Sequence, residues 1–307
     1  MATSNGGLPK TIWFLWFQGL DNAPRLVRKC HESWVAANPG WRVVFLDERS
    51  LRSVTSRDYS TGYIGKLPPQ ARSDLIRLDL LSHHGGIWAD ATCFCVQPVD
   101  DWLPPNLDSG FFAFSRPRPS QIISSWFLAA EPGNVLVSRM SERLLAYWGD
   151  HAFRNNHRRF LIKVLTRLLR RSPGTRNWWF SAPIRDWLGI YPYYAIMYMF
   201  EKLVSEDPEC ARVWADTPRV SAGPPHRLRR AGLLSPATAE LRAEIDRQQV
   251  PVYKTAWNLR GREVRDDSVL GYLLAGDGYR YAKSPISASR RDQGSDPELP
   301  QPGHDES

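Results

Sequence analysis

The pattern of hydrophobic and polar positions alternates between strand-like and helix-like stretches in the first fifty residues. Residues 10–17 are a run of β-branched and aromatic side chains, which predicts a buried strand. Apolar residues recur at helical spacing over residues 24–34, and residues 41–46 form a second strand-like run. Because a strand, a helix and a strand in succession form a βαβ unit, the sequence predicts a parallel sheet.

A second helix and a third strand are predicted next. Residues 70–84 carry a broad apolar stripe, typical of a helix packed on a sheet, and Gly85 and Gly86 end it. Residues 87–89 form a short apolar run that places Asp90 at the carboxyl end of a strand. Ligands of open α/β sheets bind at the carboxyl ends of the strands, so Asp90 is well placed for chemistry.

The remainder of the chain becomes increasingly helical and then loses its hydrophobic pattern. Strand-like runs lie at residues 111–114, 124–130 and 250–257, and helical patterns dominate residues 138–169 and 182–204. After Tyr281 no aromatic residue occurs, and residues 282–307 are rich in Ser, Pro and charged residues. We therefore expect a single domain over residues 1–281 and a disordered tail over residues 282–307.

Residues 153–171 predict a basic amphipathic helix, because apolar and basic side chains interleave there at helical spacing. Three interpretations stay open. The helix packs on the core with a solvated charged face, it lies in the surface plane of an anionic membrane, or it contacts nucleic acid. The basic residues are Arg154, Arg158, Arg159, Lys163, Arg167, Arg170 and Arg171.

Composition and charge narrow the classes of function. The chain has 307 residues, of which 42% are hydrophobic, and this excludes a protein that is disordered throughout. The net charge of +8 indicates an anionic partner, which could be nucleic acid, acidic lipid or a phosphorylated ligand. No nucleic-acid-binding motif occurs, and the basic residues are dispersed or confined to one helix, so we expect no nucleic-acid partner.

The chain shows no signal-peptide pattern and no apolar run that approaches the length of a membrane span. Its cysteines lack the spacing of a zinc site, which favours reduced thiols and a cytoplasmic protein. These cysteines are Cys30, Cys93, Cys95 and Cys210.

Candidate chemistry is concentrated in residues 72–92. Asp74 and Arg77 are three residues apart, on one face of the predicted helix, where a carboxylate accepts hydroxyl or imide hydrogen bonds and a guanidinium suits phosphate. Gly85 and Gly86 permit a sharp turn and close backbone approach to a ligand. Asp90 offers a hard oxygen ligand for Mg²⁺ or Mn²⁺, an ion that would neutralise charge on a leaving diphosphate.

Together these residues resemble the sugar-nucleotide site of glycosyltransferases with a DXD-type sugar-binding region. The arrangement is S-D-x-x-R followed by G-G-x-x-x-D-x-T, and it is most similar to the capsular polysaccharide synthesis protein family. The separation of Asp74 and Asp90 is similar to that in the yeast-type initiating mannosyltransferases. The resemblance covers about residues 9–275, and its further matches are Pro9–Lys10–Thr11–Ile12, Asn38–Pro39–Gly40–Trp41, Ser124–Ser125–Trp126–Phe127, Tyr191–Pro192–Tyr193–Tyr194 and Pro251–Val252–Tyr253–Lys254.

The resemblance implies a GT-A type α/β fold, a Rossmann-like mixed sheet flanked by helices, with helical insertions and a disordered C-terminal tail. Residues 135–205 would form a helical region on the acceptor side. The implied activity is a retaining transfer of a hexose from a UDP- or GDP-sugar to a glycan or lipid-linked acceptor. Its setting would be capsular or cell-surface polysaccharide synthesis, in the cytoplasm or at the inner face of the membrane, with residues 153–171 as a peripheral membrane contact.

The resemblance also implies roles for individual residues. Trp16 would stack on the base, Asp74 would contact the ribose or the donor sugar, and Arg77 would contact the sugar or the diphosphate. Asp90 would bind metal and ribose. The catalytic candidates are Asp90, Asp74 and Arg77, and the donor-binding set is Trp16, Asp74, Arg77, Gly85, Gly86 and Asp90.

One position departs from the family pattern. Thr92 stands where a second aspartate would complete the DXD motif, so only one carboxylate is present. A threonine hydroxyl can still ligate an ion directly or through water, and we expect Asp90 and Thr92 to hold Mn²⁺ or Mg²⁺. The alternative is a non-catalytic relative that binds a nucleotide sugar or a glycan, with Thr92 marking the loss of activity. The joint presence of Asp74, Arg77 and Asp90 argues against it.

Overall fold

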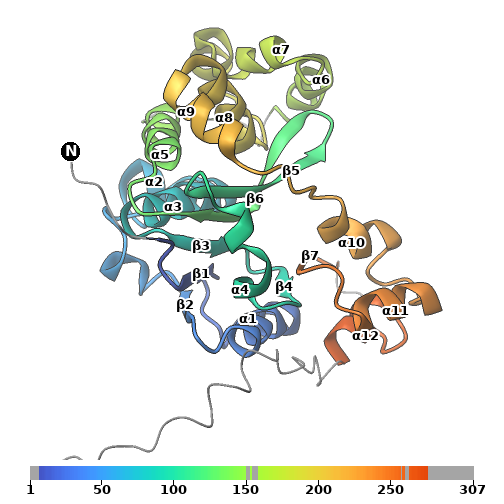
Figure 1. Ribbon diagram of the computed structural model, residues 1–307. Coiled ribbons are helices and arrows are strands. Elements are labelled where there is room, and N and C mark those ends of the chain that lie inside the picture. The colour runs from blue at the N-terminus through green and yellow to red at the C-terminus, as the bar shows by residue number, and fades with distance from the viewer. Residues whose placement is uncertain (1–6, 150–152, 154–157, 257, 260–262, 276–307) are drawn as a thin grey trace, which may run out of the picture.

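The computed structural model describes residues 7–149, 153, 158–256, 258–259 and 263–275. Its centre is a five-stranded sheet in the order β2–β1–β3–β6–β5, with helices on both faces (Figure 1). The strands of this sheet are β1 (Thr11–Leu15), β2 (Arg42–Leu46), β3 (Gly86–Ala89), β5 (Phe111–Arg118) and β6 (Gln121–Ala130). A second sheet pairs β4 (Cys93–Cys95) with β7 (Val252–Lys254).

The large sheet is mixed. Strand β1 pairs in parallel with β2 and with β3, which confirms the predicted βαβ opening. Strand β6 pairs antiparallel with both β3 and β5. The predicted α/β class with a mixed sheet flanked by helices is therefore confirmed. Because β1, β2 and β3 run in the same direction, the segments that follow them lie along one edge, which we call the carboxyl edge of the sheet.

Strand β1 shows how the sequence divides the core between the two faces. Successive side chains of a strand point to opposite faces. Ile12 and Phe14 accordingly pack in one buried cluster with α1 (Arg25–Ala37). Trp13 and Leu15 pack in the other with α3 (Pro69–His84) and α5 (Val135–Trp148).

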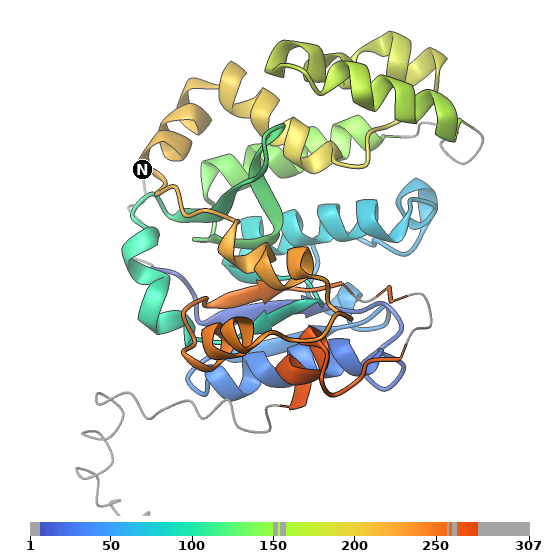
Figure 2. The ribbon, with the colours of Figure 1, turned by 90° about the vertical axis from the view of Figure 1, so that its right-hand side faces the viewer.

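Helices gather at one end of the molecule after β6 (Figures 1 and 2). Helix α5 begins after Asn134, whose side-chain oxygen accepts hydrogen bonds from the amides of Leu136 and Val137 at 3.1 and 3.4 Å, as an N-cap does. The helices that follow are α6 (Arg159–Leu169), α7 (Pro173–Asn177), α8 (Ala195–Glu206) and α9 (Pro208–Asp216). Further short helices are α2 (Gly62–Gly65), α4 (Val99–Trp102), α10 (Arg227–Ala231), α11 (Ala239–Asp246) and α12 (Val269–Ala275).

The helical patterns predicted for residues 138–169 and 182–204 correspond to α5, α6 and α8. The division into a domain of residues 1–281 and a tail of residues 282–307 stays a prediction, since that tail lies outside the described residues. The acceptor-side role of residues 135–205 is likewise untested. Over the part of the chain that the structure describes, no helix has both the length and the apolar character needed to cross a membrane.

Candidate active site

Asp90 is held at the carboxyl edge by the two strands beside it. Its backbone amide donates a hydrogen bond to the carbonyl oxygen of Trp126 on β6 at 2.9 Å. The indole Nε1 of Trp88 on β3 donates to Asp90 Oδ1, also at 2.9 Å. The side chain of Asp90 is 26% exposed, so its carboxylate is fixed in direction but accessible to a ligand.

Helix α3 supplies Asp74 and Arg77, which lie on one face of the helix as predicted. Arg77 Nη2 is 3.0 Å from Asp74 Oδ1 and 3.4 Å from Asp90 Oδ1, so one guanidinium joins both carboxylates. The same guanidinium donates to the Ser125 carbonyl oxygen of β6 and lies 5.0 Å from the ring centre of Trp88. The structure thus brings the three predicted catalytic residues into one network.

Lys254 completes this network from the far end of the sequence. Its ammonium nitrogen Nζ donates to Asp90 Oδ2 at 2.8 Å and to Thr92 Oγ1 at 2.7 Å. Strand β4 pairs antiparallel with β7, and Cys93 lies opposite Lys254. This pairing brings the lysine beside Asp90 and Thr92. In the sequence, Lys254 belongs to one of the stretches that resemble the family, and no local pattern indicates a role for it.

Burial and charge act differently on the two carboxylates. Burial raises the pKa of Asp74 to about 6, and the neighbouring Arg77 only partly offsets it. Burial also acts to raise the pKa of Asp90, but the Lys254 ammonium and the Arg77 guanidinium outweigh it and hold that pKa below its usual value. At neutral pH the network therefore contains two carboxylates and two cations.

Further cations lie near His226, a ring close enough to Lys254 for the lysine's charge to act on it. His226 packs edge-on against Trp126, with ring centres 5.6 Å apart. Burial, followed by the charges of Arg229, Lys254, Arg230 and Arg118, lowers the pKa of His226 to about 4, so the ring is neutral at pH 7. A surface with this many cations favours an anionic ligand.

The predicted metal ligands do not fit a divalent ion in this arrangement. Asp90 and Thr92 are already bridged by the Lys254 ammonium, and Asp90 is the one carboxylate of the pair. Within the described ranges, no three or more His, Cys, Asp or Glu side chains cluster in a way that could hold a metal ion. A divalent ion usually takes at least one or two carboxylates that are free to coordinate it.

Trp16 lies at the same edge as Asp90. Trp13 is opposite Trp88 in the parallel pairing of β1 with β3, so the residues that follow both strands emerge side by side. Trp16 comes directly after β1, and its amide donates to the carbonyl oxygen of Leu46 at 3.0 Å. The position suits the predicted contact with a base, which stays a prediction.

Gly85 and Gly86 lie at the opposite end of β3 from Asp90. Both have a positive φ, 64° and 94°. A Cβ atom on Gly85 would lie 2.6 Å from Pro132, and one on Gly86 would lie 2.5 Å from the Thr11 carbonyl oxygen. Close packing of helix, strand and turn explains both glycines, and the structure does not bring them together with the rest of the predicted donor site.

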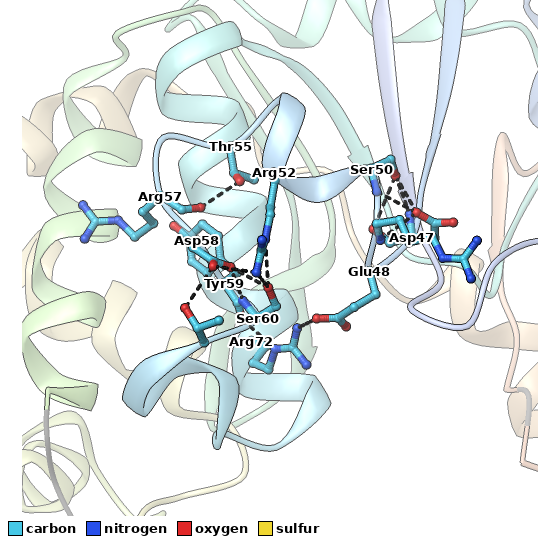
Figure 3. Close-up of polar contacts among 12 residues, drawn as sticks. Asp47, Glu48, Ser50, Arg52, Thr55, Arg57, Asp58, Tyr59, Ser60 and Arg72 are labelled. Atoms are coloured by element: carbon cyan, nitrogen blue, oxygen red, sulfur yellow. Dashed lines mark hydrogen bonds and ion pairs between the residues drawn. The ribbon is translucent and has the colours of Figure 1, made fainter.

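Arg72, near the start of α3, contacts segments at the carboxyl edge of the sheet (Figure 3). Its guanidinium contacts the Glu48 carboxylate, and its Nε donates to the Tyr59 carbonyl oxygen at 3.0 Å. It also lies 4.5 Å from the ring centre of Phe17. Since Phe17 follows β1 and Glu48 follows β2, Arg72 holds both segments against the helix that carries the site.

Comparison with known proteins decides the family. A family model described as capsular polysaccharide synthesis protein matches residues 2–182, more than half of the chain. The chain belongs to this family. The matched range includes Trp16, Asp74, Arg77 and Asp90, whereas Lys254 lies beyond it.

The relatives of this family member are glycosyltransferases by name. This chain is 28% identical over 180 residues to O-glycosyltransferase braB of Annulohypoxylon truncatum. The match covers 52% of this chain and 42% of that protein. It is 24% identical over 103 residues to the initiation-specific alpha-1,6-mannosyltransferase of Candida albicans, covering 31% and 27%. The chain spans less than half of the length of either relative.

Among solved structures, this chain is similar to the PaToxG Glycosyltransferase, with a TM-score of 0.37 and 14% sequence identity. The match covers 68% of this chain and 73% of that chain.

Proposed function

We propose that this protein is a glycosyltransferase that moves a hexose from a UDP- or GDP-sugar to a glycan or lipid-linked acceptor. One observation carries the proposal: Asp74, Arg77 and Asp90 form a single network at the carboxyl edge of the sheet. That edge is where ligands of open α/β sheets bind. The names of the relatives support the reaction class, and the family description supports a role in capsular or cell-surface polysaccharide synthesis.

The site offers hydrogen-bond acceptors for the sugar or ribose and cations for the diphosphate. Asp74 and Asp90 are the acceptors, and Arg77 orients both. In the retaining reaction that we propose, the acceptor hydroxyl attacks from the side of the leaving group. The departing phosphate then takes the acceptor's proton, so no dedicated basic side chain is required. Catalysis would rest on positioning and on electrostatic stabilisation of the leaving diphosphate.

Donor binding tests this proposal by thermal unfolding of the purified chain. We expect one subset of UDP-glucose, UDP-galactose, GDP-mannose, UDP and GDP to raise the melting temperature by about 5 °C at a concentration near 100 times the Kd. The base that stabilises identifies the donor class. ADP-glucose serves as the control nucleotide sugar. If no UDP or GDP compound shifts the transition, the proposed function is wrong.

We also propose that α6 contacts an anionic membrane at the cytoplasmic face. Phe160, Val164 and Leu168 recur at every fourth residue and are 80%, 38% and 45% exposed. The adjacent face of α6, which carries Leu161, Leu165 and Leu169, packs against the small core cluster around Trp179, so only part of the apolar surface of α6 is covered. Exposed basic side chains flank the stripe: Arg159, Lys163, Arg167, Arg170 and Arg171. An apolar stripe beside basic residues fits an anionic bilayer surface, close to lipid-linked acceptors.

Co-sedimentation with lipid vesicles tests the membrane contact. We expect the chain to bind phosphatidylglycerol vesicles more strongly than phosphatidylcholine vesicles. The double substitution Phe160→Ser and Leu168→Ser should weaken this binding by at least about 10-fold, because it removes buried apolar surface from the bound state. Val35→Ser is the matched control, since Val35 is 48% exposed on α1. Equal binding of the wild type to both vesicle types would contradict the proposal.

A further inference from the structure

Lys254 stands between the two side chains that the sequence marks as metal ligands. Its Nζ lies within hydrogen-bond distance of Asp90 Oδ2 and Thr92 Oγ1, at 2.8 and 2.7 Å. An ion that took both of these oxygens would have to occupy the place of the ammonium. The lysine side chain is only 12% exposed and extends from a strand, so the position is built into the fold.

The charges around Asp90 are already balanced without a further ion. The carboxylates of Asp74 and Asp90 face the guanidinium of Arg77 and the ammonium of Lys254. A divalent ion would add two positive charges beside two cations, and Asp90 would have to exchange its lysine partner for the ion. Of the two cations, Lys254 is the more accessible to an entering anion, since its side chain is 12% exposed and that of Arg77 is 6% exposed.

The ammonium also keeps a donor for that anion. A lysine ammonium has three N–H groups. The contacts seen among the described residues use two of them, one to Asp90 and one to Thr92. These two bonds fix the nitrogen in place and leave a third N–H for a phosphate oxygen.

We propose that Lys254 is a catalytic residue that binds the diphosphate of the donor and replaces the divalent metal, so that transfer does not require a metal ion. The inference rests on the proposed sugar transfer. In that reaction the bond between sugar C1 and the β-phosphate oxygen breaks, and its electron pair stays on the phosphate oxygen. The acceptor oxygen forms the new bond to C1, and its proton passes to the phosphate. Lys254 stabilises the charge that develops on that oxygen.

The first part of the test asks whether the wild-type chain needs a metal ion to bind and transfer the donor. The nucleotide sugar that gives the largest thermal shift is titrated by calorimetry in excess EDTA and, separately, with Mn²⁺. We expect its Kd and its turnover to agree within about 2-fold in the two conditions, since the site holds its own cation. Loss of donor binding or turnover in EDTA, restored by Mn²⁺, would overturn the inference and leave the proposed function standing. A wild type that binds no nucleotide sugar in either condition contradicts the proposed function itself.

The variant arm tests the lysine. Lys254→Gln should weaken binding of the nucleotide sugar by about 10- to 100-fold, because one charge-assisted hydrogen bond to the diphosphate is lost. Binding of the matching nucleoside, which lacks the diphosphate, should not change, and Lys254→Arg should recover part of the donor affinity. Lys202→Gln is the control, because Lys202 pairs with Glu206 on α8. Equal donor affinity in Lys254→Gln and wild type would overturn the inference.

Discussion

Asp90→Asn should lower kcat/KM for the nucleotide-sugar donor by at least about 100-fold, the size of effect seen when a preorganised electrostatic group is removed from an active site. The carboxylate of Asp90 holds both Lys254 and Arg77, at 2.8 and 3.4 Å. An amide keeps the shape of the side chain but removes the charge that orients these two cations. Steady-state kinetics over a range of donor concentrations measures the effect.

The same substitution will also lower stability, so the kinetic assay needs a folding control. Two largely buried cations lose a counter-charge, which we expect to reduce the free energy of unfolding by about 2 to 3 kcal/mol. Activity is therefore measured below the melting temperature of the variant, checked by circular dichroism. Asp216→Asn is the matched control, because Asp216 is exposed at the end of α9. A folded Asp90→Asn variant with wild-type kcat/KM would show that Asp90 is not in the active site.

Gly86→Ala adds only one methyl group but should strongly destabilise the sheet. Gly86 has a φ of 94°, and an added Cβ atom would lie 2.5 Å from the carbonyl oxygen of Thr11. An L-residue in this conformation costs about 1–2 kcal/mol. Displacing a neighbouring strand adds about 1–3 kcal/mol. We expect the free energy of unfolding, measured by urea denaturation, to fall by about 3 kcal/mol or more.

Gly133→Ala separates the two contributions to that loss. Gly133 also has a positive φ, 71°, but no atom lies within 4 Å of the Cβ position. Gly133→Ala should therefore lower the free energy of unfolding only by the conformational contribution, about 1–2 kcal/mol. If Gly86→Ala and Gly133→Ala destabilise the chain equally, close contact with β1 is not the reason for glycine at position 86.

The first half of the fold could be predicted from the sequence because its signals are local. The run of residues 10–17, the helical spacing after Pro24 and the apolar stripe of residues 70–84 each appear as the expected element. The contact of Asp74 with Arg77 follows from their spacing on a helix. These predictions needed no knowledge of how distant segments meet.

What could not be predicted depends on long-range pairing. Lys254 is on a strand of three residues, and only its pairing with β4 brings it to Asp90. The helices α9 to α12 have five to nine residues each, too short for a clear periodic pattern. The sequence predicts that the backbone at Gly85 and Gly86 approaches a ligand, whereas the neighbours of these glycines in the structure are Pro132 and Thr11. A glycine pattern shows that something lies close to the backbone, but not what it is.

We expect the network of Asp74, Arg77, Asp90 and Lys254 to bind the diphosphate and the sugar of the donor. A crystal structure of the wild-type chain with the nucleotide sugar selected by thermal unfolding tests it most directly. We expect a diphosphate oxygen about 2.8 Å from Lys254 Nζ, with the sugar or ribose hydrogen-bonded to Asp74 or Asp90. A donor bound away from the carboxyl edge, or a diphosphate held by a metal ion with Lys254 displaced, would contradict it.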